Sequence, residues 1–226
     1  MFLKTPKIKI SEMLLKVAGS FIHMGENMSP FPTEPQKIKK QINRYEAALR
    51  KEYEKYRCIN DGSGTRYLLG PLYLLLGDIP GVIKSFEWFA REFNDDSGES
   101  FHTLCWALAL YRSGNMAGAA KKLRDTMLSN MYMLPYLFGI EQPQLDIWHS
   151  TNLERKDYVE QAPPELYKLW DEQALRWAQG LYESDDFRYA RERTIEIFRR
   201  LKSEPQGTTR LQLVKELSVI RGSNPA

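Results

Sequence analysis

The sequence predicts an all-helical fold, and three observations carry that prediction. Apolar residues recur at steps of three and four along most of the chain, no segment alternates apolar and polar residues, and clusters of Gly, Asn and Asp interrupt the apolar pattern. The chain has 226 residues, of which 42% are hydrophobic and 27% charged. Such a chain can bury a core without disulfides, so we expect one soluble helical domain.

The first long helix is expected directly after a capping-box pattern that spans Thr33 to Gln36. Basic side chains cover most of its surface, and the run 60–64, Asn-Asp-Gly-Ser-Gly, ends it. One apolar stripe follows the 3.6-residue period of a helix. The stripe consists of Ile38, Ile42, Tyr45, Leu49, Tyr53 and Tyr56.

Two helical hairpins are predicted next. The first has helices at 65–76 and from Gly77-Asp78 to about 93, and the second has helices at 100–113 and 116–130 around Gly114-Asn115. The second hairpin recurs 71 positions later, which is close to twice the roughly 34-residue period of helix-turn-helix repeats. The recurring residues are Trp106-Ala107, Leu110-Tyr111, Ser113, Ala119 and Met127, matched by Trp177-Ala178, Leu181-Tyr182, Ser184, Ala190 and Phe198.

At this spacing the chain resembles the tetratricopeptide repeat (TPR) family. In the first copy the signature positions hold Leu69-Gly70, Tyr73, Gly77-Asp78, Val82, Phe86 and Phe89. The resemblance implies a right-handed superhelix of antiparallel helix-turn-helix hairpins, a TPR-like α-solenoid, in which small residues such as Gly70 let paired helices approach closely. The chain departs from the pattern at Arg66, where the family has a tryptophan-like position, and at Asn94 and Met131, where it has proline.

The expected organisation is a single helical domain with an arm in front of it. The arm, 1–32, contains a short amphipathic helix capped by Ser11, since Lys16 divides the apolar run that a signal peptide would need. The domain spans 33–222 and ends in a capping helix, and 223–226 is a tail. Its hairpin repeats lie at about 65–97, 100–131 and 171–202, an irregular insertion fills 131–165, and the capping helix is marked by Leu211, Val214 and Leu217.

Composition and charge exclude several classes of function. The formal net charge is +3, too small to indicate a dedicated nucleic-acid or membrane binder, and no run approaches the roughly 18 apolar residues of a membrane helix. Residues 1–57 carry a net +6, residues 58–150 a net −3 and residues 151–226 no net charge. Two cysteines suit a reducing compartment, so a cytoplasmic location is expected.

The sequence contains no arrangement of residues that indicates catalysis. We therefore expect that the protein is not an enzyme and that it holds neither a cofactor nor a metal ion. His102 and Cys105 lie one helical turn apart but lack further ligands, so the interpretation is a core cysteine and a partly exposed histidine. The run 62–65 precedes a helix without the lysine of a phosphate loop, and a helix cap by Thr65 accounts for it. Asp95-Asp96 and Asp185-Asp186 lie where acidic residues complement helix N-termini.

The resemblance implies protein binding along the concave groove that the first helices of the hairpins line. We expect the occupant to be a peptide or helix of another protein, or a helix of this chain folded back into the groove, and a homo-oligomer remains possible. The groove positions are mostly apolar. They are Tyr67, Leu74, Leu104, Leu108, Tyr111, Arg112, Gln179 and Tyr182, with Pro71, Leu75 and Leu175 beside them.

Two alternatives stay open at this point. The basic N-terminal helix is compatible with a nucleic-acid partner, although solubility alone explains such a charged face. The insertion carries Trp148 and His149 beside several hydrogen-bonding side chains, which is compatible with a ligand-binding or enzymatic pocket. The simpler interpretation of Trp148 is that it fills the gap that an interrupted repeat leaves.

Overall fold

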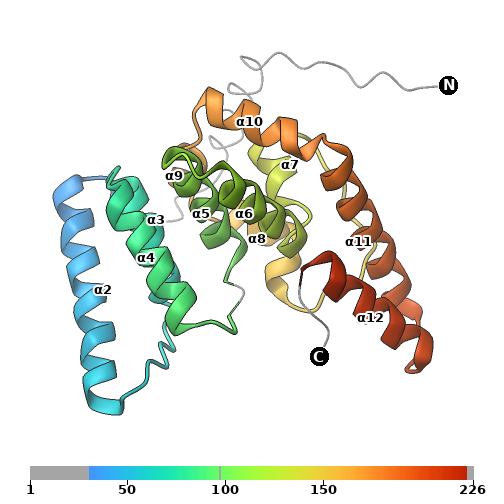
Figure 1. Cartoon of the computed structure of the whole chain (residues 1–226), viewed down its shortest axis with the longest axis horizontal. Helices are drawn as coiled ribbons and strands as arrows, with labels where there is room; N and C mark the ends of the chain where they lie inside the picture. Colours follow the sequence, from blue (N-terminus) through green and yellow to red (C-terminus); the bar gives the residue numbers. More distant parts are fainter. Residues whose placement is uncertain (1–30, 97, 223–226) are drawn as a thin grey trace.

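The computed structural model describes residues 31–96 and 98–222, and within these ranges the chain is all-helical, as predicted (Figure 1). The predicted arm helix and the tail 223–226 lie outside the described residues. In order, the helices are α2 (Pro35–Tyr56), α3 (Arg66–Leu75), α4 (Ile79–Glu92), α5 (Ser100–Arg112), α6 (Met116–Ser129), α7 (Met133–Leu137), η2 (Asn152–Glu154, a 3-10 turn), α8 (Lys156–Gln161), α9 (Pro164–Tyr167), α10 (Glu172–Tyr182), α11 (Asp185–Ser203) and α12 (Thr208–Ile220).

Helix α2 is the long basic helix that the sequence predicts, and its buried residues Ile38, Ile42 and Leu49 lie on the predicted stripe. The predicted capping box is wrong. Glu34 is the N-cap, it makes no side-chain capping bond, and Pro35 occupies the first turn. Proline suits that position because its fixed φ is helical and its missing N–H would have no partner within the helix.

The α3–α4 hairpin confirms the predicted turn and the predicted close approach. Gly77 adopts φ +71° and the Asp78 carboxylate caps α4 by accepting the Gly81 N–H at 3.0 Å. A Cβ at Gly70 would lie 2.5 Å from the ring of Phe86, so the two helices touch where glycine removes the side chain. Any larger residue at position 70 would force the buried Phe86 ring to move.

The α5–α6 hairpin repeats this design. Gly114 adopts φ +83° in the turn, and the Asn115 side chain caps α6 by accepting the Gly118 N–H at 3.0 Å. Ala107 and Ala119 are completely buried, which fits their predicted place at the contact between the helices. The positions that recur 71 residues later are buried in the same way, since Ala178 and Ala190 are also fully inaccessible.

Helices α10, α11 and α12 form the other end of the molecule. Helices α10 and α11 diverge from the turn that joins them (Figure 1). Helix α11 packs along α12 and against α6. Part of the insertion lies along α11, because the Trp148 backbone N–H donates to the Phe198 carbonyl at 3.1 Å and the two rings pack at 6.1 Å. Insertion residues therefore take up surface of α11 that a neighbouring helix could otherwise cover.

The stripe predicted for the last helix is wrong in part. Leu213 and Leu217 are the buried residues of α12, whereas Leu211 and Val214 are about half exposed. The sequence of α12 has apolar residues on more than one side, so periodicity alone selected the wrong pair. The buried pair joins a small cluster with α11 and the insertion, made of Ile147, Ile197, Phe198, Leu201, Leu213 and Leu217.

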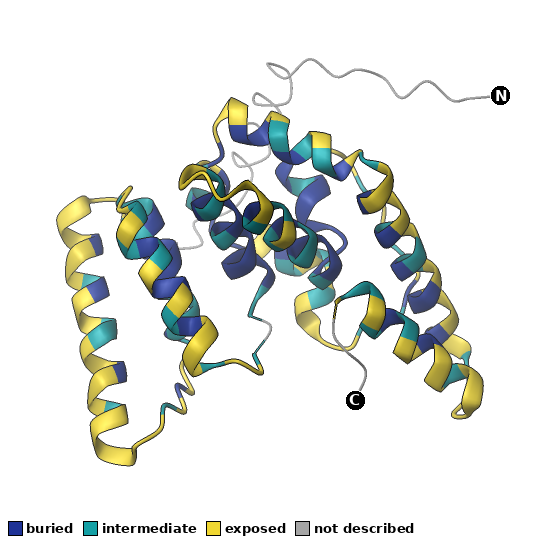
Figure 2. Cartoon of the chain, in the orientation of Figure 1, coloured by how far each residue is buried: buried dark blue, intermediate teal, exposed yellow. Residues whose placement is uncertain are grey.

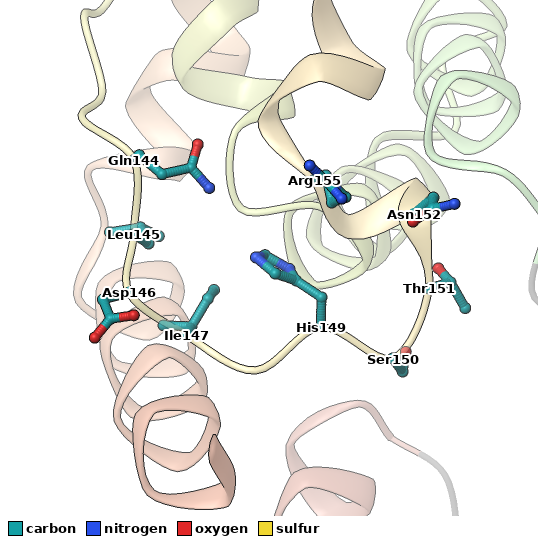
Figure 3. A pocket seen from close by; sticks show the side chains of 9 residues that line it. All are labelled: Gln144, Leu145, Asp146, Ile147, His149, Ser150, Thr151, Asn152 and Arg155. Atoms are coloured by element: carbon teal, nitrogen blue, oxygen red, sulfur yellow. The ribbon is translucent and has the colours of Figure 1, made fainter. Parts of the chain in front are cut away.

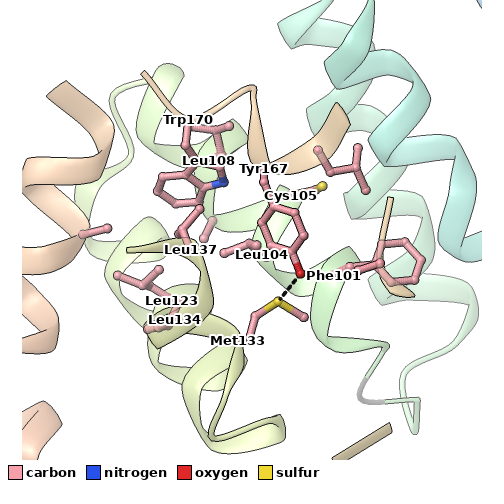
Figure 4. Close-up of a cluster of buried hydrophobic side chains, with 14 of the residues drawn as sticks. Phe101, Leu104, Cys105, Leu108, Leu123, Met133, Leu134, Leu137, Tyr167 and Trp170 are labelled. Carbon is pink, nitrogen blue, oxygen red and sulfur yellow. Dashed lines mark hydrogen bonds between the residues drawn. The ribbon is translucent and has the colours of Figure 1, made fainter. Parts of the chain in front are cut away.

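The main core lies between the two ends of the molecule. Figure 2 shows buried residues on the sides of α3 to α7 that face one another, and exposed residues over most of α2. The insertion also contributes to this core, through residues such as Tyr132, Met133, Leu134 and Phe138. Figure 4 shows its centre, where α5 and α6 meet α7 and the segment around α9, with the side chains Phe101, Leu104, Cys105, Leu108, Leu123, Met133, Leu134, Leu137, Tyr167 and Trp170.

Candidate functional site

The side chains predicted to line a partner-binding groove do not form one open surface. Leu74, Leu104 and Leu108 are at most 1% exposed, and Pro71 beside them is buried. Buried positions cannot contact a partner without unfolding what covers them. The prediction of an open groove at these leucines is therefore wrong, and of the two kinds of occupant considered, the chain itself is the one found there.

The insertion and the segment after it provide the cover. Tyr167 and Trp170 lie against Leu104 and Leu108 (Figure 4), and both aromatic side chains are under 5% exposed. The Tyr167 hydroxyl is within 3.0 Å of the Val159 carbonyl, which ties the end of α9 to α8. Large aromatic side chains dominate core energetics, so this filling stabilises the fold as well as closing the groove.

The other predicted groove residues serve contacts within the chain. The Tyr67 hydroxyl donates to Asp96 at 2.6 Å, and Tyr111 packs against the Trp177 ring at 4.7 Å. Arg112 donates to the Leu169 carbonyl, Gln179 donates to Glu183, and Tyr182, 9% exposed, packs against Phe138. These five residues come from three helices, and none of them faces an open apolar cleft together with the others.

An open groove lies elsewhere, between α2 and α4, which both pack against α3. We call it the α2–α4 groove, and it encloses about 610 Å³. On α2 and α4 each lining position is three or four residues from another lining position of the same helix, which places them on one side of each helix. They comprise Glu46, Leu49, Arg50 and Tyr53 of α2, Leu69 and Tyr73 of α3, Gly81, Lys84, Ser85, Glu87, Trp88, Arg91 and Glu92 of α4, with Ile59.

The bottom of this groove is apolar and its sides are aromatic. Leu49 and Leu69 are about 5% exposed and form the buried base. Tyr53 is 46% exposed at the rim, and Trp88 is half-buried with its ring 5.5 Å from Phe93. An exposed tyrosine and a half-buried tryptophan over buried leucines are the residue types and the depth gradient of a protein-binding groove.

One hydrogen bond crosses the groove from α3 to α2. The Tyr73 hydroxyl donates to a Glu46 carboxylate oxygen at 2.6 Å. Burial first, and then the neighbouring Glu46 carboxylate, raise the pKa of Tyr73 above its usual value. Tyr73 therefore stays a neutral donor at every physiological pH, and it fixes the spacing of the two helices.

The charges that line the groove leave two cations unpaired. Glu46 accepts from Tyr73, and Glu92 accepts from the Arg91 Nε at 3.0 Å. Arg50 of α2 and Lys84 of α4 are exposed and form no ion pair with another described residue. The lining as a whole is balanced, because Arg50, Lys84 and Arg91 are matched by Glu46, Glu87 and Glu92, so the groove carries no net charge.

The second candidate from the sequence, the insertion around Trp148 and His149, forms a shallow polar cavity of about 490 Å³. Figure 3 shows the side chains that line it, all from residues 144–155. Trp148 is not among them, because its ring packs on Phe198, as the space-filling interpretation predicts. His149 does line the cavity.

His102 and Cys105 are both core residues. His102 is 1% exposed and lies within 6 Å of the Phe86, Phe89 and Tyr67 rings, so the prediction of a partly exposed histidine is wrong. Burial, and then the Lys122 charge, lower the pKa of His102 to about 3. Burial raises the pKa of the Cys105 thiol, which makes it inert. Across 31–96 and 98–222, no group of three or more His, Cys, Asp or Glu side chains could hold a metal ion.

The helix N-terminus after 62–65 already holds an anion of the chain. The Asp61 carboxylate accepts the backbone N–H groups of Thr65 at 2.9 Å and Arg66 at 2.7 Å. Thr65 makes no side-chain capping bond, so the predicted cap by Thr65 is wrong, and Asp61 fills this role. Asp61 thus occupies the position where a phosphate would bind.

Comparisons with family models, with curated proteins and with solved structures find no match to this chain. The resemblance to tetratricopeptide repeats therefore rests on the chain's own residues. None of the described helices has both the length and the apolar character that crossing a membrane requires.

The α2–α4 groove was missed from the sequence because its apolar α2 residues belonged to a stripe interpreted as core. Leu49 and Tyr53 lie on the predicted apolar stripe of α2, yet the first is buried and the second exposed. A usable signal was present. The α2 stripe ends in two tyrosines, Tyr53 and Tyr56, and a tyrosine-rich end of a stripe is typical of a surface that is only partly covered.

Proposed function

We propose that this chain is a non-enzymatic interaction module of the cytoplasm that binds an amphipathic helix of a partner protein in the α2–α4 groove. The single observation that carries the proposal is an open groove with a buried leucine base and aromatic sides, next to a core that has filled the other apolar face. Helix-in-groove binding uses apolar anchors spaced three and four apart, which fit a groove between two helices.

The charged side chains at the rim of the groove determine which kind of amphipathic helix would bind. Arg50 and Lys84 extend from opposite walls, and neither is neutralised by a described carboxylate. A partner helix with an acidic residue beside its apolar face would pair with these cations. Complementary charges at a rim raise the association rate and fix the register of the bound helix more than they add affinity.

The proposal includes a tetratricopeptide-like arrangement of the scaffold. The α3–α4 and α5–α6 hairpins are joined by Gly-containing turns and pack on each other, which supports a short superhelical stack. In this arrangement α2 extends the stack at its N-terminal side, and the groove lies between two second helices of successive units. The insertion ends the regular stack after α6.

Site-specific photo-crosslinking in native cells tests the position of the partner. A crosslinkable phenylalanine analogue replaces Tyr53 in the groove, and a matched variant carries it at Tyr189, which is 65% exposed on α11. We expect a partner adduct from position 53 and none from position 189. Mass spectrometry of the adduct must identify an acidic amphipathic segment, and its synthetic peptide must bind the purified chain.

Charge-reversal variants then test the chemistry. Lys84→Glu and Arg50→Glu should each weaken peptide binding about tenfold or more, and Trp88→Ala should do the same by removing an aromatic anchor. Lys215→Glu, on the exposed side of α12, is the matched control and should bind normally. Peptide binding that survives all three groove substitutions would contradict the proposal.

Other occupants give distinguishable results in the same experiment. An adduct between position 53 and residues 1–30 of the same chain, or with a second copy of the chain, would overturn the proposal of a foreign partner. A nucleic-acid partner would be lost on nuclease treatment, and its binding would weaken steeply with salt. Either result would replace the helix-binding proposal.

A further inference from the structure

The cavity formed by residues 144–155 presents hydrogen-bond donors that the fold does not use (Figure 3). The Arg155 Nε donates to Asp157 at 3.3 Å, and the terminal guanidinium nitrogens have no partner among the described residues. The Gln144 amide likewise makes no hydrogen bond within 31–96 and 98–222. Both side chains lie beside the same space in Figure 3.

His149 adds a third donor. Its ring points into the space between Gln144 and Arg155 (Figure 3), while its Nδ1 atom is buried without a partner in the described chain. A neutral imidazole carries one N–H, and an N–H on the buried Nδ1 would be left unpaired. Orphaned N–H groups are rarer in proteins than orphaned acceptors, so the proton belongs on Nε2, where it donates towards the cavity.

The carboxylates near the cavity are engaged in hydrogen bonds and ion pairs with other residues of the chain. Asp146 lines the cavity, but its side chain points away from Arg155 in Figure 3 and pairs with Lys202 of α11. Glu154 accepts the Ser150 N–H and hydroxyl at 2.7 Å each. Asp157 pairs with Arg155 through Nε at 3.3 Å and offsets part of its charge, while the terminal guanidinium nitrogens have no partner among the described residues.

The backbone around the cavity is held in place by buried polar side chains. Asn130, 1% exposed, donates its amide to the Leu153 carbonyl at 2.7 Å and the Arg155 carbonyl at 3.0 Å. The hydroxyl of the buried Tyr132 accepts the Leu145 N–H at 2.9 Å. These bonds fix the backbone at both ends of the segment that carries Gln144, His149 and Arg155, which limits the backbone rearrangement that binding would require.

We propose that this cavity binds a small organic anion, a molecule with a carboxylate or phosphate group held by Arg155, His149 and Gln144. Its volume of about 490 Å³ lies within the range of metabolite sites. Charge-assisted hydrogen bonds from an arginine to such a group are stronger than neutral ones. The site is separate from the α2–α4 groove, and the proposal does not depend on that function.

The test is titration of the full chain with inorganic phosphate and with malonate, followed by NMR of the His149 ring and by calorimetry. Sodium chloride at matched ionic strength is the reference. We expect saturable binding with a dissociation constant of about 1 mM or tighter, and a shift of the His149 ring resonances. Binding by phosphate alone or malonate alone identifies which head group the site takes.

Variants separate this site from adventitious binding. Arg155→Gln and His149→Asn should each weaken binding at least about tenfold while circular dichroism stays helical. Arg188→Gln, an exposed arginine at the start of α11, should bind as the unchanged chain does. No saturable response up to about 10 mM, or equal binding by Arg155→Gln and Arg188→Gln, would overturn the proposal.

Discussion

The molecule has two apolar faces that are both rich in leucine in the sequence. In the fold, one of them is covered by other parts of the chain and the other stays open. The face of α3 and α5 that carries Leu104 and Leu108 is closed by Tyr167 and Trp170. The face between α2 and α4 has a similar leucine base, but Tyr53 and Trp88 at its sides stay accessible. An apolar stripe therefore predicts a surface that tends to be covered. Whether a segment of the same chain covers it depends on how the rest of the chain packs.

The largest effect should separate the two faces by stability. Leu108→Ala removes a fully buried side chain from the closed face and should lower the free energy of unfolding by about 2–5 kcal/mol. Leu49→Ala, at the base of the groove, should lower it by less because its neighbours are open to water. Urea unfolding followed by circular dichroism measures both. Equal losses would mean that the groove is packed as tightly as the core.

A somewhat smaller loss of stability is expected at Asn130, whose hydrogen bonds hold the insertion in place. Asn130→Ala removes two donated bonds and the acceptor for the Tyr132 N–H at 2.8 Å, so it should destabilise the chain by about 2–3 kcal/mol. Hydrogen exchange should rise in 144–155 before it rises in α3 or α4. Unchanged exchange in that segment would show that the insertion is held by packing alone.

The contact between α5 and the α3–α4 hairpin contains a buried histidine, His102, whose protonation should destabilise the fold at acidic pH. The pKa of His102 is about 3 in the fold, against about 6.5 in an unfolded chain. Between these values the unfolded state binds the extra proton, so stability is complete above pH 6.5 and falls with decreasing pH, by up to about 1.4 kcal/mol per pH unit.

Denaturation midpoints at pH 6.5, 5.5 and 4.5 measure this effect, with His102→Phe as the control. The control should lose the slope in this window while keeping the fold. A slope that persists in His102→Phe would assign the acid sensitivity to other groups, such as Asp96, whose pKa is lowered because its hydrogen bonds from Tyr67, the Gly98 N–H and Arg66 outweigh burial.

The smallest stability effect should come from the groove itself. Arg50→Gln changes an exposed side chain without an ion pair in the described chain, so unfolding should shift by no more than about 0.5 kcal/mol. Trp88→Ala removes a half-buried side chain, so it should lower the free energy of unfolding by more than Arg50→Gln does but by less than Leu108→Ala does. Loss of the fold in either variant would show that the groove walls belong to the core, and it would remove the comparison between the two faces.

The sequence by itself determined the helices and their turns. Period-3.6 stripes, Gly77 and Gly114 at left-handed turns, and Gly70 and Ala119 at helix contacts are local requirements, and the structure meets each of them. Local errors concerned caps, such as Glu34 and Asp61, and the choice of buried residues on α12. A cap depends on one or two backbone angles, and a neighbouring residue can take the role when it reaches the same N–H groups.

Only the tertiary structure decided which apolar face stayed open. The insertion shows no repeat signature, and its helices α7 and α9 are short, yet Tyr167 and Trp170 from this region fill the predicted groove. Periodicity assigns a residue to the apolar side of its own helix, but burial depends on which distant segment returns to that side. The sequence therefore predicted the long helices and the turns of the first two hairpins but not the short helices α7, α8 and α9, while the choice between a covered and an open face came from packing across the chain.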